Sequence, residues 1–185
     1  MKMEKSLKSD RNDPRLANKL TNVLFIIYLA ALFWILLFKL GVRFSYMENR
    51  NVNLVPFSEF LSSNHKINWV ELISNIVIFI PLGVYTGILF KRWAFLNKLL
   101  FFFLITLMFE GLQFIMKVGA FDVTDIFTNI SGGIIGLLIF EVVEKVFNNS
   151  ARSQRFINVI AAIGTVLILS LLVLLKLNML PVKYQ

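Results

Sequence analysis

The sequence predicts an all-α polytopic membrane protein, a helical bundle with five transmembrane helices. Of the 185 residues, 57% are hydrophobic and only 16% are charged, whereas a soluble domain carries about 25% charged residues. The apolar residues are gathered in runs of about 20, the length at which an α-helix crosses a bilayer. The chain contains no cysteine, which excludes disulfides, thiolate metal ligands and a cysteine nucleophile.

Each apolar run is an expected span. The first run is longer than the apolar region of about 7–15 residues in a signal peptide, and no small-residue cleavage site follows it. We therefore expect this segment to stay in the mature protein as a membrane span. In the loop that follows, Pro56 favours an extended or turn conformation before it, and a short surface helix is expected after it. Pro81 should kink the second span. The expected spans are residues 20–40, 70–90, 95–116, 125–143 and 156–175.

The net charge of +8 is interpreted as contact with the lipid bilayer and not with a nucleic acid. The distribution of the basic residues along the chain predicts its orientation in the membrane. Lysine and arginine are enriched in cytoplasmic segments of membrane proteins. Six of them lie in residues 1–19, and the short segments 91–98 and 144–155 are also basic. We therefore expect a plasma-membrane protein with a cytoplasmic basic tail (1–19) and an outside C-terminus. The segment 146–185 would hold a cytoplasmic connection, the fifth helix and a short outer tail.

Polar residues gather between the third and fourth spans, and they are the candidate site. A carboxylate near the bilayer centre costs about 2.5–3.5 kcal/mol, so intramembrane ionisable residues are functional candidates. Glu110 lies about 7 Å beyond the midpoint of its span and needs a partner, for which Lys117 is suitably spaced. Asp122 and Asp125 open the fourth span. With the expected orientation these three carboxylates, the candidate catalytic residues, lie in the outer leaflet. The candidate binding residues on the same side are Asn53, Asn75, Gln113 and Asn129.

Several of these residues also have structural explanations. Asp125 is placed to cap the fourth helix, and Asn75 is suited to interhelical hydrogen bonding; for both, the structural and functional roles stay open. Gly132 and Gly136 have the small-xxx-small spacing that lets membrane helices approach closely, and packing is favoured over ligand approach. His65 is interpreted as a surface residue.

Four motifs in order resemble the VanZ-like family of bacterial membrane proteins. They are RNVNLVPF (50–57), NIVIFIPLG (75–83), EGLQ (110–113) and FDVTDIFTN (121–129), followed by glycines 132, 133 and 136. The resemblance covers residues 20–145, the expected VanZ-like membrane domain, and adds Arg50 to the binding candidates. The best-known family member is associated with resistance to the glycopeptide teicoplanin. The resemblance therefore implies a contribution to glycopeptide tolerance or to cell-envelope function.

Three kinds of function fit this pattern. A binding protein would hold a lipid-linked envelope precursor or a glycopeptide through the outer polar residues, and we place it first. An acid–base or metal-dependent membrane enzyme is the alternative, in which the carboxylates act as acid and base or hold a divalent metal with Asn75 and Asn129. A small transporter comes third, because the chain shows no clear internal repeat. The sequence leaves open whether a metal or another cofactor is used.

Overall fold

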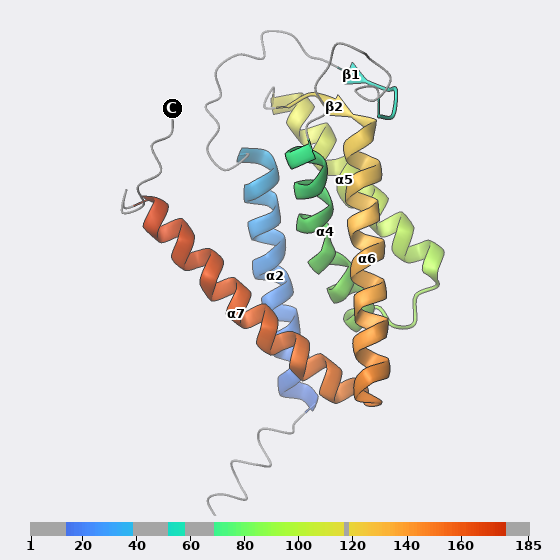
Figure 1. Ribbon diagram of the computed structural model, residues 1–185, viewed down its shortest axis with the longest axis vertical. Helices are drawn as coiled ribbons and strands as arrows, with labels where there is room; N and C mark the ends of the chain where they lie inside the picture. Colours follow the sequence, from blue (N-terminus) through green and yellow to red (C-terminus); the bar gives the residue numbers. More distant parts are fainter. Residues whose placement is uncertain (1–13, 39–51, 58–68, 117–118, 177–185) are drawn as a thin grey trace, which may run out of the picture. The chain divides into compact units, whose positions relative to one another are not determined.

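The computed structural model describes residues 14–38, 52–57, 69–116 and 119–176 (Figure 1). Within this part of the chain the structure is helical apart from short turns and two strands of two residues each. The elements are α2 (Pro14–Phe38), β1 (Val52–Asn53), α4 (Trp69–Leu89), α5 (Phe95–Met116), β2 (Phe121–Asp122), α6 (Val123–Phe147) and α7 (Ser150–Lys176). The predicted all-α class is confirmed.

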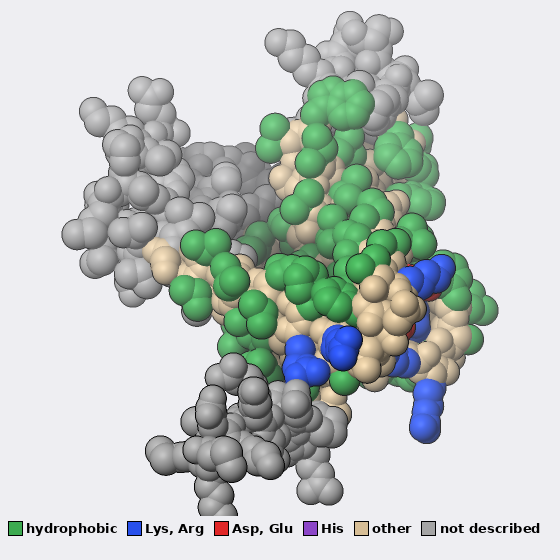
Figure 2. Space-filling model, turned by 60° about the horizontal axis from the view of Figure 1, so that its bottom comes forward, with side chains coloured by type: hydrophobic (Ala, Val, Ile, Leu, Met, Phe, Trp, Pro, Cys, Tyr) green, Lys and Arg blue, Asp and Glu red, His purple; other side chains and the backbone are tan. Residues whose placement is uncertain are grey.

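Four of the described helices, α2, α4, α5 and α6, are long and apolar enough to cross a membrane. Their outward side chains suit a lipid environment, since many large hydrophobic residues such as Val70, Leu96 and Leu138 are exposed. Figure 2 shows hydrophobic side chains covering much of the described surface on the face in view. The fifth predicted span corresponds to α7, and its crossing of the membrane stays a prediction.

The helix boundaries differ most from the sequence prediction at the start of α2 and between α6 and α7. α2 begins at Pro14, upstream of the expected start at residue 20, because proline is well suited to the first turn of a helix. The polar connection expected over 144–155 is mostly helical: α6 continues to Phe147 and α7 begins at Ser150. Asn148 adopts a positive φ of 45°, and the Asn149 Oδ1 atom accepts from the backbone N–H of Ala151 and Arg152. A break of two residues therefore ends one helix and caps the next.

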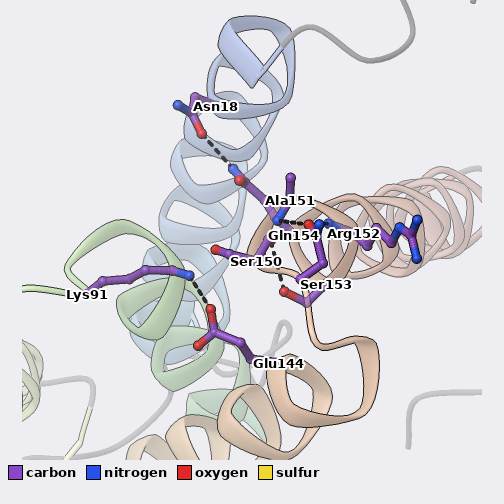
Figure 3. Close-up of polar contacts among 9 residues, drawn as sticks. Asn18, Lys91, Glu144, Ser150, Ala151, Arg152, Ser153 and Gln154 are labelled. Atoms are coloured by element: carbon purple, nitrogen blue, oxygen red, sulfur yellow. Dashed lines mark hydrogen bonds and ion pairs between the residues drawn. The ribbon is translucent and has the colours of Figure 1, made fainter.

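The chain forms two compact units. The first comprises residues 1–28 and 147–185, and in it the start of α2 is joined to α7 by side-chain hydrogen bonds. Thr21 donates to Asn158 Oδ1 at 3.0 Å, and Gln154 donates to Thr21 Oγ1 at 2.8 Å. Gln154 also donates to Asn18 Oδ1 at 2.9 Å (Figure 3). Polar side chains of this kind hold membrane helices together where burial from water supplies no driving force.

The second unit, residues 29–146, is organised around a close contact between α4 and α6. A Cβ atom added at Gly83 would overlap the backbone of Gly133 and Gly136, and one added at Gly136 would overlap the Ile80 carbonyl. Gly132 likewise lies against the Ile76 carbonyl. The expectation that the glycine stripe serves helix packing is confirmed, because side chains at these positions would hold the two backbones apart.

At one end of the second unit, an ion pair joins the residues after α4 to α6. Lys91, after α4, donates to Glu144 near the end of α6 (Figure 3), and its ammonium group also lies 5.2 Å from the centre of the Phe140 ring. The candidate site residues belong to the opposite ends of these two helices. Lys91 and Glu144 therefore offer a matched place for control substitutions.

Residues 52–57 confirm the predicted extended or turn conformation before Pro56: β1 is followed by a bend at Val55 and a turn over Pro56 and Phe57. The short helix expected after Pro56 falls on residues 58–68, outside the described residues. α4 is continuous across Pro81. The pairing of β1 with β2 was not predicted, and it is the feature that assembles the site.

Candidate functional site

The site is built where β1 pairs with β2. The two strands are parallel, with Val52 opposite Phe121 and Asn53 opposite Asp122. This register brings together residues that are 69 positions apart, and the Asn53 amide donates to Asp122 Oδ2 at 3.0 Å. Asn53 Oδ1 also accepts from the Val55 backbone N–H at 3.2 Å, which fixes the side chain at the start of the turn. The loop between the first two spans is thereby anchored to the start of α6.

Asp122 caps α6. Its Oδ1 atom accepts from the backbone N–H of Thr124 at 2.7 Å, the bond that defines an aspartate at the N-cap position. The sequence offered Asp125 for this role, but α6 begins at Val123 and Asp125 is already inside its first turn. One carboxylate oxygen of Asp122 therefore caps the helix, and the other accepts a hydrogen bond from Asn53.

The turn after β1 contacts the same end of α6. The Phe57 backbone N–H donates to Thr124 Oγ1 at 3.0 Å, and the Phe57 ring lies 6.2 Å from the Phe127 ring. Phe57 has a φ of 55°, which is unusual for a bulky residue and is maintained only where surrounding contacts determine it. Sequence reasoning missed Thr124 and Phe57, although both lie within the family-like motifs.

Glu110 reaches the site from α5. The residue is 3% exposed, and its Oε2 atom accepts from the Asp122 backbone N–H at 3.3 Å. A buried carboxylate is tolerated when hydrogen-bond donors face it, and this contact supplies one. Lys117, the partner suggested by sequence spacing, lies outside the described residues. The predicted proximity of Glu110 and Asp122 is present in the structure.

Asp125 is joined to α4. The Asn75 side-chain amide donates to Asp125 Oδ1 at 2.7 Å, and Asn75 is 9% exposed. The sequence left open whether Asn75 serves helix packing or the site, and the geometry gives it a contact with a candidate site carboxylate across the α4–α6 interface. A short amide–carboxylate hydrogen bond is stronger than a neutral one.

The remaining predicted site residues have different positions. Gln113 donates to the Leu36 carbonyl at 2.9 Å, so it ties α5 to the end of α2. Asn129 is 1% exposed, and its Oδ1 atom has no hydrogen-bond partner. Arg50 lies outside the described residues. The structure therefore gathers Asn53, Glu110 and Asp122 in one hydrogen-bonded group, and Asn75 with Asp125 in a second.

These two groups, which we call the polar cluster (Asn53, Asn75, Glu110, Asp122 and Asp125), share the first turn of α6. They can accept hydrogen bonds from a ligand, and paired carboxylates can also act as acid and base. Among the described residues, no group of three or more His, Cys, Asp or Glu side chains is arranged to hold a metal ion. The carboxylates and amides of the polar cluster themselves offer hydrogen bonding and proton exchange.

The fold and this site define a multi-pass α-helical membrane protein with a polar cluster at one end of its apolar helices. The VanZ/LLP1 family model matches residues 25–144, and the chain belongs to this family. Protein VanZ of Enterococcus faecium is 37% identical over 158 residues, which cover 83% of this chain and 91% of the relative. No solved structure matches significantly. The family match includes every member of the polar cluster.

Proposed function

We propose that the polar cluster binds a ligand of the cell envelope, a lipid-linked precursor or a glycopeptide, at the outer leaflet of the plasma membrane, and that this binding contributes to teicoplanin tolerance. The observation that carries the proposal is the assembly of the polar cluster. Its members come from the loop after the first span, from α4, from α5 and from the start of α6. Four separate chain segments converge on it, and packing of apolar helices alone does not require that convergence.

The charge pattern supports an outer location. With the basic segments 1–19, 91–98 and 144–155 in the cytoplasm, the start of α6 and the loop containing Asn53 are outside. A ligand presented at the outer leaflet would then meet the polar cluster directly. The family relationship supports the phenotype, since the VanZ-like family is associated with teicoplanin resistance.

Teicoplanin susceptibility of a sensitive bacterial host tests the proposal. The host carries either the chain under an inducible promoter or the empty vector, with membrane levels measured by an epitope tag. We expect the inhibitory concentration of teicoplanin to rise with induction. An unchanged inhibitory concentration at a high membrane level of the protein would overturn the tolerance part of the proposal.

Acid–base catalysis on an envelope or lipid-linked substrate is the second candidate. The observation in its favour is the buried carboxyl of Glu110, which accepts from the backbone N–H of Asp122 at the start of α6. Comparing Asp125→Asn with Asp125→Ala separates the two functions. The amide keeps the shape and one acceptor oxygen of the side chain but cannot exchange a proton, so an enzyme loses as much tolerance with asparagine as with alanine. A binding protein retains more tolerance with asparagine.

A further inference from the structure

Two buried polar atoms in the described part of the chain have no hydrogen-bond partner: Thr106 Oγ1 and Asn129 Oδ1. The two residues are 0% and 1% exposed. The great majority of buried polar groups are hydrogen-bonded, and leaving one unpaired costs about 1–3 kcal/mol. Two such atoms on neighbouring helices therefore indicate that a third group completes their hydrogen bonds.

Thr106 also differs from Thr86 and Thr128, two other buried threonines of the second unit. The hydroxyls of Thr86 and Thr128 donate to the carbonyls of Leu82 and Thr124, four residues earlier in their own helices, at 2.7 and 3.1 Å. This local bond is how a helical threonine in an apolar setting usually satisfies its hydroxyl. The Thr106 hydroxyl makes no such bond, so it is available to a group outside its own helix.

Helices α5 and α6 contact each other at two levels along their length. Thr106 on α5 and Asn129 on α6 both lie between these two levels. On the site side, Glu110 accepts from the Asp122 backbone. On the other side, the Phe102 ring lies against Gly133. Thr106 is four residues from both Phe102 and Glu110, one helical turn in each direction, and Asn129 is one turn from Gly133. The two unpaired atoms therefore belong to the layer directly inside the polar cluster.

We propose that Thr106 and Asn129 form an inner subsite, one helical turn below Glu110, that binds an O–H group. The proposal rests on the proposed function only for the source of that group, which is either water or a hydroxyl of the envelope ligand. Asn129 Oδ1 can only accept, so the bound group must donate to it. The Thr106 hydroxyl can donate in return, and an O–H group satisfies both atoms at once.

The inner side of the subsite is closed. Phe79 and Phe102 are both 0% exposed and lie against Gly132 and Gly133, respectively. The Phe102 ring packs on Gly133, and the Cβ atom of Phe79 lies near Gly132, so apolar atoms cover this side of the subsite.

Thermal unfolding of the purified protein in lipid nanodiscs tests the subsite through a double-mutant cycle. The variants are Thr106→Val, Asn129→Leu and their combination, which remove the unpaired atoms and keep the number and branching of the side-chain heavy atoms. Thr86→Val is the matched control, because Thr86 is equally buried but bonded within its own helix. Teicoplanin tolerance of cells expressing each variant at matched membrane levels is the second readout.

If water occupies the subsite, each single variant lowers the unfolding temperature more than Thr86→Val does. The double variant then lowers it no further, because either change alone breaks the bridge. If a ligand hydroxyl occupies it, the unfolding temperature of the ligand-free protein is unchanged or raised, while each single variant loses as much tolerance as the double variant.

Two results would overturn the subsite. One is unchanged or raised stability together with full tolerance in all variants, the outcome expected when an unused buried polar atom is removed. The other is a strictly additive loss of stability, which would indicate two separate packing defects. If the parent chain gives no tolerance, the proposed function fails, and the unfolding cycle alone decides the water-bound subsite.

Discussion

At the scale of the residue, Asp122 has two structural duties in addition to its proposed role in ligand binding. It caps α6 through Thr124 and holds the Asn53 side chain. Asparagine is as good an N-cap as aspartate, whereas alanine loses the cap. The effect of a substitution at Asp122 on stability must therefore be separated from its effect on function.

We expect Asp122→Ala to reduce stability by about 0.5–2 kcal/mol through the lost cap. Asp122→Asn keeps the cap but loses the oxygen that accepts from Asn53, so we expect it to reduce stability less than alanine does. For a chain of this size each kcal/mol corresponds to a shift of about 2–4 °C in Tm. Unfolding followed by circular dichroism in detergent micelles measures both variants. Equal shifts for alanine and asparagine would show that the cap is not what Asp122 contributes.

The sequence could identify most of the polar cluster but not its connections. Carboxylates and amides in apolar runs are conspicuous, so Glu110, Asn75 and Asp125 were predicted. Thr106 was missed, because a threonine in an apolar run usually satisfies its hydroxyl within its own helix and gives no signal. Asp125 was one candidate for the cap, whereas Asp122 caps α6 in the structure, because sequence patterns locate the start of a helix only to within about two to four residues.

At the scale of the element, α4 and α6 depend on their shared glycines. Gly136 lies against the Ile80 carbonyl and Gly83, so a methyl group there forces the helices apart. The same contact holds Asn75 and Asp125 within hydrogen-bonding distance. Packing of the two helices and assembly of the polar cluster are therefore coupled.

We expect Gly136→Ala to destabilise the protein by about 1–3 kcal/mol, the usual cost of overpacking, and to reduce tolerance. Gly111→Ala is the control: a Cβ atom at Gly111 meets nothing within 4 Å, and alanine inside a helix should gain about 0.5–1 kcal/mol. Unfolding temperatures of the two variants in the same detergent are compared. A stabilised Gly136→Ala protein would contradict the close α4–α6 contact.

The helices could be predicted from the sequence, but the two short strands could not. α5 (Phe95–Met116) has the predicted bounds, because a basic turn and a polar segment enclose its apolar run. The parallel pairing of Val52 and Asn53 with Phe121 and Asp122 joins two segments of two residues each. Such short strands have no alternation of polar and apolar residues to predict them, so only the structure reveals how the loop reaches α6.

At the scale of the whole molecule, the proposed function requires the polar cluster to face the outside of the cell. The absence of cysteine from the chain makes this testable with single introduced cysteines. Leu54 is 66% exposed beside the polar cluster, and Arg92 is exposed at the opposite end of α4. Both belong to the second unit, so the comparison requires no assumption about the first.

We expect a membrane-impermeant maleimide to label Leu54→Cys in intact cells, and to label Arg92→Cys only after the membrane is permeabilised. The reason is the cytoplasmic preference of the basic segments. Labelling of the denatured proteins controls for reactivity. Labelling of Arg92→Cys but not Leu54→Cys in intact cells would reverse the orientation and place the polar cluster in the cytoplasm.

The measurement that tests the central claim most directly is teicoplanin tolerance of Glu110→Gln and Asp125→Asn beside Glu144→Gln, all at matched membrane levels. Each change removes one carboxylate charge with little change of shape. Glu144 pairs with Lys91 at the other end of the second unit, so its substitution controls for loss of charge alone. We predict that tolerance falls for the first two variants and persists for Glu144→Gln. Full tolerance in all three would contradict the claim that the carboxylates of the polar cluster form a working site.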